Sequence, residues 1–275
     1  MPANRAQHRK AFGQHFLRDE KVIGTIITQV TQDVAALKPK RVLEIGPGQG
    51  ALTYPFLDRH MEPPFEFVLC EKDRKIAAQW KEKATIRTLE SDFMELPESE
   101  WLTDGLYIFS NLPYSAGTAI FTRLAVHTQK IPAMTLMFQK EVADRLLASP
   151  DSPHDRSDLG SLSLWTQNLW QTQNLCDVPP RAFRPPPKVW SAVVRFTPRA
   201  QPLFAGTDPG TAGGKKWESL IKTAFSQRRK MLRASLKGHP LMGKALEQAQ
   251  VDGTKRSEAL SWAEWSRWWS AFSVL

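Results

Sequence analysis

Three glycines stand at alternate positions in the segment Glu44-Ile-Gly46-Pro-Gly48-Gln-Gly50, directly after a short apolar stretch. Glycines at such a place let the backbone turn tightly and let a ligand approach the main chain. Glu71 ends the next apolar stretch, about twenty residues further on, where a carboxylate can accept both ribose hydroxyls of a nucleoside. The spacing therefore predicts a site for a nucleoside-containing cofactor.

A second carboxylate, Asp92, lies beyond the third apolar stretch, where it can accept the amino group of an adenine. Gly46, Gly48 and Ala51 also satisfy the G-x-G-x-x-G/A fingerprint of dinucleotide sites. A nicotinamide cofactor and a purely structural turn therefore stay open as alternatives. Glu44 favours S-adenosylmethionine, because a carboxylate attracts the ammonium group of that cation more than it suits a pyrophosphate.

The tetrapeptide Asn111-Leu112-Pro113-Tyr114 follows a fourth apolar stretch. The Asn111 side-chain oxygen and the Leu112 carbonyl can accept the two N–H bonds of an adenine amine and hold its nitrogen in line with a methyl donor. Pro113 stiffens the loop, and Tyr114 offers a flat face for an extruded base. The alternative is a turn with a capping Asn and a core Tyr.

Phe183 opens a proline-rich segment, Phe183-Arg-Pro-Pro-Pro-Lys188. An aromatic ring between cations on a stiff loop can clamp the second face of the same base. A rigid surface loop with a buried Phe explains the segment equally well, and the sequence leaves both interpretations open.

Short apolar strands alternate with amphipathic helices in the first part of the chain. This alternation predicts an α/β fold with a parallel, doubly wound, Rossmann-like sheet. Its expected strands cover 41–45, 65–70, 86–89, 106–109 and 133–139, and its expected helices cover 19–36, 51–57, 74–83 and 116–126. The carboxyl ends of these strands would bring the glycine segment and the Asn111 tetrapeptide to one edge.

The sequence after residue 139 predicts one more helix over 160–174, an antiparallel edge strand over 191–196, and a linker over 198–214. Beyond the linker the pattern is helical. We therefore expect a catalytic domain over 1–198 and a small all-helical domain over 199–275. A tryptophan stripe in the last helix has the spacing of a buried face, at Trp262, Trp265 and Trp269.

The net charge is +9, and the basic residues cluster in 1–18, 181–199 and 215–237. Such clusters suit a polyphosphate partner, although a solvated surface is the alternative. We predict a basic helix over Gln227–Lys237 on which Arg229, Arg233 and Lys237 share a face. Its expected RNA-binding residues are Arg228, Arg229, Lys230, Arg233 and Lys237.

Other features limit the class of protein. Cys70 and Cys176 lie far apart in unlike contexts, so no disulfide is expected, and the histidines show no zinc-ligand spacing. There is no apolar run long enough for a membrane span and no signal-like N-terminus. We expect a cytoplasmic monomer without a metal ion.

Together these motifs resemble the ribosomal RNA adenine N6-dimethyltransferases, and in particular the type that modifies two adjacent adenosines near the 3′ end of small-subunit (16S) rRNA. The resemblance runs from about Phe12 to the C-terminus. It rests on the segments FGQHFL, EIGPGQGALT, NLPY, QKEVADRL, FRPPPKVWSAVV, QRRKMLRASL and RSEALS, with Glu71 and Asp92 between them.

The resemblance implies S-adenosylmethionine as cofactor, contacts to a small-subunit precursor through the helical domain, and a role in ribosome biogenesis. The residues it places at the cofactor are His15, Leu17, Gly46, Glu71, Asp92 and Asn111. The chain departs from the family pattern at four places. His15 replaces a usual Asn, Trp190 replaces a common Asp, and Ala116–Ala119 replaces an Ile-Ser-Thr-Pro-like stretch. The stretch Leu159–Ser163 lacks the Tyr and Arg often found there. A large-subunit dimethyltransferase and an RNA-binding assembly factor remain as alternatives.

Overall fold

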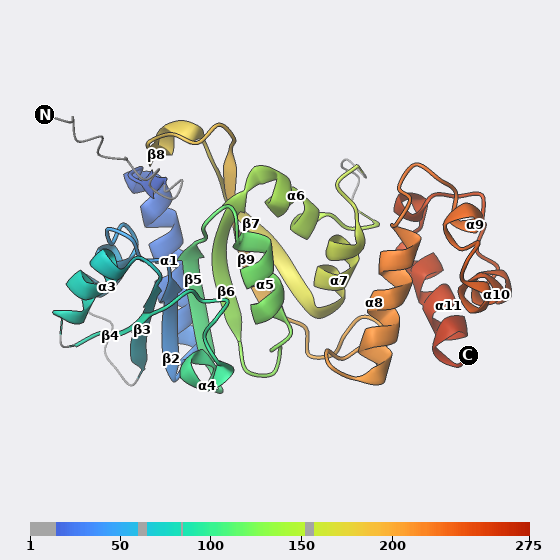
Figure 1. Ribbon diagram of the computed structural model, residues 1–275, viewed down its shortest axis with the longest axis horizontal. Helices are drawn as coiled ribbons and strands as arrows, with labels where there is room; N and C mark the ends of the chain where they lie inside the picture. Colours follow the sequence, from blue (N-terminus) through green and yellow to red (C-terminus); the bar gives the residue numbers. More distant parts are fainter. Residues whose placement is uncertain (1–14, 60–64, 84, 152–156) are drawn as a thin grey trace, which may run out of the picture.

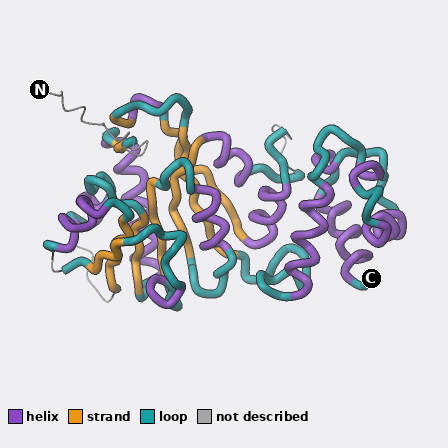
Figure 2. The backbone as a smooth tube through the Cα atoms, viewed as in Figure 1, coloured by secondary structure: helices purple, strands orange, loops and turns teal. Residues whose placement is uncertain are grey.

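The computed structural model describes residues 15–59, 65–83, 85–151 and 157–275. The predictions for the basic segment 1–14 lie outside these ranges. The described chain forms a seven-stranded mixed sheet that is flanked by helices and continues into a helical C-terminal region (Figures 1 and 2). In spatial order its strands are β4 (Arg87–Glu90), β3 (Glu66–Glu71), β2 (Arg41–Ile45), β5 (Leu106–Asn111), β6 (Ala133–Gln139), β9 (Ser191–Pro198) and β7 (Trp170–Val178).

The five strands from β4 to β6 run parallel, as the strand–helix alternation predicts, and β9 pairs antiparallel with both β6 and β7. Alternate residues of these strands enter two separate cores. Leu43 and Ile108 face one core, whereas Val42 and Phe109 face the other. Both faces of the sheet are covered, which explains why these strands are almost continuously apolar.

The helices divide between the two faces of the sheet, with α1 behind it and α5 and α6 in front in the view of Figure 1. Asp19 caps the first helix by accepting hydrogen bonds from the backbone N–H groups of Lys21 and Val22, at 3.0 and 3.1 Å. The helices are α1 (Glu20–Leu37), α2 (Thr53–Leu57), α3 (Arg74–Lys81), α4 (Glu98–Trp101), α5 (Gly117–Ala125), α6 (Lys140–Leu147) and α7 (Ser161–Leu169).

The prediction of a helix over 160–174 is wrong beyond Leu169, because Trp170–Val178 forms β7. The predicted strand near Ser191 is antiparallel, but it is not at the edge, since β7 pairs along its outer side. Only Trp170 and Val178 of β7 are buried, and its other side chains are polar or partly exposed. An edge strand of this kind lacks the apolar alternation that identifies a strand in a sequence.

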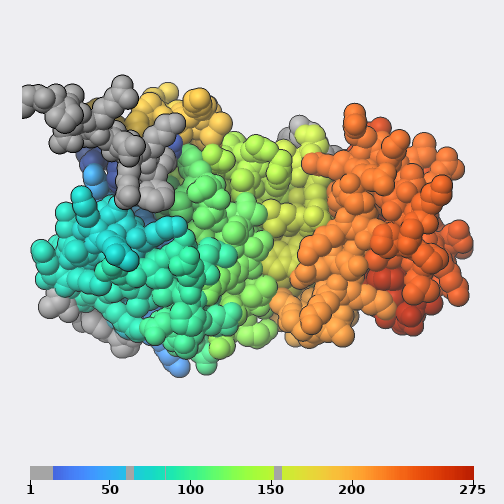
Figure 3. Space-filling model, viewed as in Figure 1, coloured from blue at the N-terminus to red at the C-terminus, as the bar shows by residue number. Residues whose placement is uncertain are grey.

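The C-terminal region packs four helices around a tryptophan-rich core: α8 (Ala212–Ala224), α9 (Leu232–Ser235), α10 (Pro240–Gln248) and α11 (Trp262–Ser273). Trp265 and Trp269 are buried and Trp262 packs against the same cluster, which confirms the predicted core stripe. Leu159 and Leu164 also enter this core, so the helical region packs directly on α7. Figure 3 shows it as a rounded end of the molecule. The domain boundary after residue 198 stays a prediction.

The predicted helix over Gln227–Lys237 is wrong. α8 ends at Ala224, turns follow, and α9 covers only Leu232–Ser235. The backbone N–H groups of Leu232 and Arg233 bond to the carbonyl oxygens of Lys255 and Gly253, at 2.8 and 3.0 Å. These donors are held by the chain before α11 and not by the preceding helical turn.

No helix in the described ranges is both long enough and apolar enough to cross a membrane.

Candidate active site

The carboxyl ends of β2, β3, β4 and β5 meet at one edge of the sheet, the upper edge in Figure 1. This edge carries the glycine segment after β2, Glu71 at the end of β3, Asp92 after β4 and Asn111 at the end of β5. Open parallel sheets bind their ligands at such an edge. The structure therefore brings the glycine segment with its carboxylates and the Asn111 tetrapeptide to the same edge of the sheet.

The glycine loop adopts a conformation that only glycine accommodates easily. Gly46, Gly48 and Gly50 have φ angles of 67°, 53° and 86°. A Cβ atom on Gly50 would lie 2.5 Å from the ring of Tyr54. The Gly48 carbonyl accepts a 3.0 Å hydrogen bond from Trp80 Nε1, so a side chain of α3 also holds the glycine loop in place.

Two carboxylates line the loop on the side of β3 and β4. Glu71 is 6% exposed and accepts hydrogen bonds from the backbone N–H groups of Gly48 and Asp73, at 3.1 and 2.9 Å. Asp92 accepts hydrogen bonds from Lys72 Nζ at 2.6 Å and from the Met94 backbone N–H at 2.9 Å. The Lys72 hydrogen bond lowers the pKa of Asp92, which keeps this side chain ionised.

Glu44 lies beneath the glycine loop and is 2% exposed. Its Oε2 accepts a 2.7 Å hydrogen bond from the Thr53 hydroxyl. Burial raises the pKa of Glu44 to about 8, with the nearby charge of Glu71 adding to the effect. Without a bound cation this carboxyl group is therefore mostly protonated at neutral pH.

The raised pKa of Glu44 predicts a change in the stability of the protein. Between pH 4.5 and about 8 the unfolded chain is ionised at Glu44 and must take up a proton to fold. The free energy of unfolding should therefore fall as the pH rises through this window, by at most about 1.4 kcal/mol per pH unit. Glu44→Gln should remove this contribution and gain stability relative to the wild type up to about pH 8.

Urea unfolding at a series of pH values measures this difference. Glu95→Gln, on an exposed side chain, is the matched control. If the free energy of unfolding changed with pH in the same way for Glu44→Gln and the wild type, the raised pKa of Glu44 would be contradicted.

The Asn111 tetrapeptide leaves the expected acceptors available. Asn111 Nδ2 donates to the His15 carbonyl at 3.5 Å, so its amide nitrogen is directed to the chain and its Oδ1 has no hydrogen bond from a described residue. The Leu112 carbonyl likewise accepts no hydrogen bond from the described chain, because the next turn uses the Pro113 carbonyl. Tyr114 is half-buried, and its hydroxyl bonds to Ser191 Oγ at 2.6 Å.

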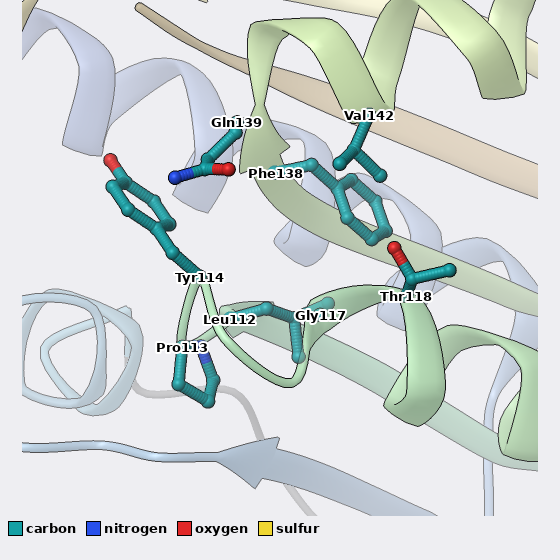
Figure 4. A pocket seen from close by; sticks show the side chains of 8 residues that line it. All are labelled: Leu112, Pro113, Tyr114, Gly117, Thr118, Phe138, Gln139 and Val142. Atoms are coloured by element: carbon teal, nitrogen blue, oxygen red, sulfur yellow. The ribbon is translucent and has the colours of Figure 1, made fainter. Parts of the chain in front are cut away.

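A hollow of about 10 Å³ lies behind this tetrapeptide. Figure 4 shows its lining, which comprises Leu112, Pro113, Tyr114, Gly117, Thr118, Phe138, Gln139 and Val142. It holds no more than a water molecule, and a purine is far larger.

Phe183 is 1% exposed, and its ring meets Tyr114 edge to face at 6.5 Å. The sequence left open whether Phe183 is an accessible base clamp or a buried side chain on a rigid loop, and in the structure it is buried. It belongs to β8 (Phe183–Arg184), which pairs antiparallel with β1 (Phe16–Leu17). Leu17 is buried beside it.

The residues around β1 form one wall of the site, which we call the N-terminal wall (His15–Asp19). His15 Nδ1 bonds to the Pro185 carbonyl at 2.7 Å, and the His15 ring lies 5.5 Å from the Tyr114 ring. The unusual His15 side chain therefore faces the proline-rich loop. Arg18 also bonds to the Gln49 side chain of the glycine loop, at 2.7 Å.

Several residues that support the site were missed from the sequence alone. Thr53, Trp80 and Ser191 hold Glu44, Gly48 and Tyr114, respectively. Thr53 is the last residue of the EIGPGQGALT segment, so its place in this motif could have identified it as part of the site. The contacts of Trp80 and Ser191 join elements distant in the chain, and no spacing rule connects them.

The predicted RNA-binding residues are all exposed in the C-terminal region, and we call them the basic surface: Arg228, Arg229, Lys230, Arg233 and Lys237. They do not share one helix. Arg228 donates to the Leu159 carbonyl at 2.9 Å and to the Ser157 carbonyl, so part of its role is to join the helical region to the chain before α7.

Within the described ranges there is no group of three His, Cys, Asp or Glu side chains that could hold a metal ion.

The parallel sheet, the glycine loop after β2 and the carboxylate at the end of β3 define a Rossmann-like nucleotide-cofactor fold of the class I methyltransferase type. A solved dimethyladenosine transferase from Plasmodium falciparum superposes with a TM-score of 0.72 at 22% identity, over 94% of this chain and 98% of that chain. The 23S rRNA methyltransferase ErmE gives 0.66 at 26% identity, over 94% and 99%. These likenesses confirm the predicted fold class.

The sequence comparisons specify the family. The model for "Ribosomal RNA adenine dimethylase" matches residues 5–272. Proteins named "Ribosomal RNA small subunit methyltransferase A" are 38% identical in Dichelobacter nodosus, over 94% of this chain and 93% of the relative, and 38% identical in Pseudomonas aeruginosa, over 95% and 94%. The chain belongs to the ribosomal RNA adenine dimethylase family, which confirms the resemblance drawn from the motifs.

Proposed function

We propose that the chain transfers methyl groups from S-adenosylmethionine to the N6 amines of two adjacent adenosines near the 3′ end of 16S rRNA, during assembly of the small ribosomal subunit. The family supports the reaction type, and the names of the curated relatives support the small subunit. One structural observation carries the chemistry: Asn111 Oδ1, to which no described residue donates, stands at the same sheet edge as the carboxylate-lined glycine loop.

The residues present fit S-adenosylmethionine. Positive φ angles at Gly46, Gly48 and Gly50 open the main chain to a ligand, Glu71 has acceptor capacity for ribose hydroxyls, and Asp92 can accept from an adenine amine. Glu44 would balance the ammonium group, which favours its ionised form. When bound, the cofactor supplies a methyl group on a sulfonium cation. His15, Leu17 and Asn111 would complete its surroundings.

The chain positions the acceptor nitrogen. The amine of adenine is a poor nucleophile, because its lone pair is delocalised into the ring. Accepting its two N–H bonds at Asn111 Oδ1 and the Leu112 carbonyl would favour the pyramidal geometry of attack. Tyr114 would support the base by stacking, with Phe183 behind it fixing the ring, and Pro113 would keep the loop stiff.

The test is to incubate the protein with radiolabelled S-adenosylmethionine and each ribosomal subunit from cells that lack the modification. Label on two adjacent adenosines of small-subunit RNA is the expected result. Label on the large subunit would support the alternative that the similarity to ErmE leaves open. Subunit binding without label would support an assembly factor.

The basic surface should supply affinity for RNA and not base specificity, because phosphate contacts carry no sequence information. Arg229→Ala with Arg233→Ala should weaken small-subunit binding and flatten its salt dependence by up to about two units of slope. The methylated adenosines should stay the same. Binding across a salt series measures the slope.

Lys40→Ala with Lys130→Ala is the matched control, since these exposed lysines precede β2 and β6 at the opposite edge of the sheet. An unchanged slope in the arginine double variant would exclude a docking role. Methylation at other adenosines would show that the basic surface selects the base.

A further inference from the structure

Trp190 is the most exposed tryptophan of the chain. Its side chain is 50% exposed, whereas the other nine tryptophans are buried or half-buried. Within the described ranges its ring makes no hydrogen bond, ring contact or cation–π contact. Its ring is therefore an open apolar surface that a partner can cover, and covering it would contribute to binding.

The backbone ties Trp190 to the active site. Its carbonyl accepts a 2.8 Å hydrogen bond from the Lys140 backbone N–H, at the junction of β6 and α6. The next residue, Ser191, bonds to the Tyr114 hydroxyl at 2.6 Å. Trp190 is therefore one residue away from the contact that holds the proposed stacking tyrosine.

The neighbours of Trp190 along the proline-rich segment are apolar or basic, whereas the Lys140 side chain, next to its backbone contact, pairs with Asp144 and Asp177. Val189 beside it is 44% exposed. Arg184 and Lys188 are exposed and form no ion pair in the described part of the chain. Residues 181–199 contain five basic residues and no acidic one, and of these Arg195 pairs with Asp33. An aromatic ring among unpaired cations on a proline-stiffened loop is the chemistry that binds single-stranded RNA, by stacking on bases and attracting phosphates.

We propose that Trp190 is a stacking platform for the base of the nucleotide next to the target adenosine. This inference rests on the proposed function, because it assigns a subsite of the same site. An adenosine that turns toward Asn111 leaves the stack, and its neighbour then loses a stacking partner. In this proposal Trp190, one residue before Ser191 in the chain, replaces that partner, and Arg184 and Lys188 on the same loop supply positive charge for the phosphates.

The experiment compares Trp190→Ala and Trp190→Phe with the wild type in steady-state methylation of unmodified small subunits. Loss of a base–aromatic stack should raise the KM of Trp190→Ala for subunits about five- to a hundredfold, with kcat nearly unchanged. Trp190→Phe keeps a flat ring and should restore most of the affinity. The salt slope of binding should stay that of the wild type, because stacking neutralises no phosphate.

Leu37→Ala is the matched control, since Leu37 is an apolar side chain with 38% exposure at the end of α1. A KM for Trp190→Ala equal to that of Leu37→Ala would overturn the proposal. So would an equal loss of binding to subunits whose 3′ RNA segment has been removed, because the partner would then be a ribosomal protein. Failure of the proposed function is distinct, since the wild-type protein would then not methylate the small subunit.

Discussion

Replacing Asn111 with alanine should lower kcat for methyl transfer to small subunits by a factor of about 10²–10³, with subunit binding retained. The side chain stands at the end of β5, and its Oδ1 is the acceptor that the described chain leaves free. RNA affinity should persist, because phosphate contacts on distant surfaces do not involve this residue.

Single-turnover methylation measures the effect, and the affinity for S-adenosylmethionine must be measured beside it, since Asn111 also contacts the His15 carbonyl. Asn174→Ala is the matched control, because Asn174 is an exposed asparagine of β7 that bonds to Asp177. A near-normal kcat in Asn111→Ala would refute its role in presenting the amine.

Replacing Glu71 with alanine should weaken S-adenosylmethionine binding by roughly 1.5–3 kcal/mol, through loss of charge-assisted hydrogen bonds to the ribose. The structure adds a second contribution, because Glu71 also holds the N–H groups of Gly48 and Asp73. Glu71→Gln separates the ribose contribution from the contribution of the backbone contacts, since glutamine keeps an acceptor for a backbone N–H but loses the charge.

Isothermal titration gives both affinities, and urea unfolding checks that the fold is intact. Glu66→Ala serves as the control on the same strand, where the carboxylate pairs on the surface with Arg41 and Arg87. Tight binding of a nicotinamide cofactor without binding of S-adenosylmethionine would overturn the cofactor assignment.

The sequence predicts the parts of the fold in which local pattern and burial agree. Strands such as Arg41–Ile45 and Ala133–Gln139 are apolar because both faces of the sheet are covered, so their bounds are predicted as observed. Trp170–Val178 fails for the opposite reason, because it is an edge strand with one partner and a largely polar surface. Gln227–Lys237 has helical composition, but its backbone donors bond to the chain near Lys255.

The candidate site likewise contains residues that the local sequence pattern predicts and properties that it does not predict. Glu71, Asp92 and Asn111 follow predictable strands, and the topology of a parallel sheet then brings them to one edge. The protonated state of Glu44 at neutral pH depends on the depth of its burial, which no motif encodes. The contact between Tyr114 and Ser191 depends on the register between β6 and β9.

The N-terminal wall has a thermodynamic consequence. On one side the Phe16 ring would lie 3.3 Å from a Cβ on Gly48, and Arg18 bonds to Gln49. On the other side, Leu17 pairs with Phe183 in β1–β8, and the N–H groups of Arg18 and Asp19 bond to the Ala182 carbonyl at 2.8 and 3.3 Å. The N-terminal wall thus contacts both the glycine loop and the segment that carries Phe183. A ligand that displaces the wall from one side changes its contacts on the other side. Linkage then requires that a cofactor and an RNA base coupled through this wall change each other's dissociation constants by the same factor.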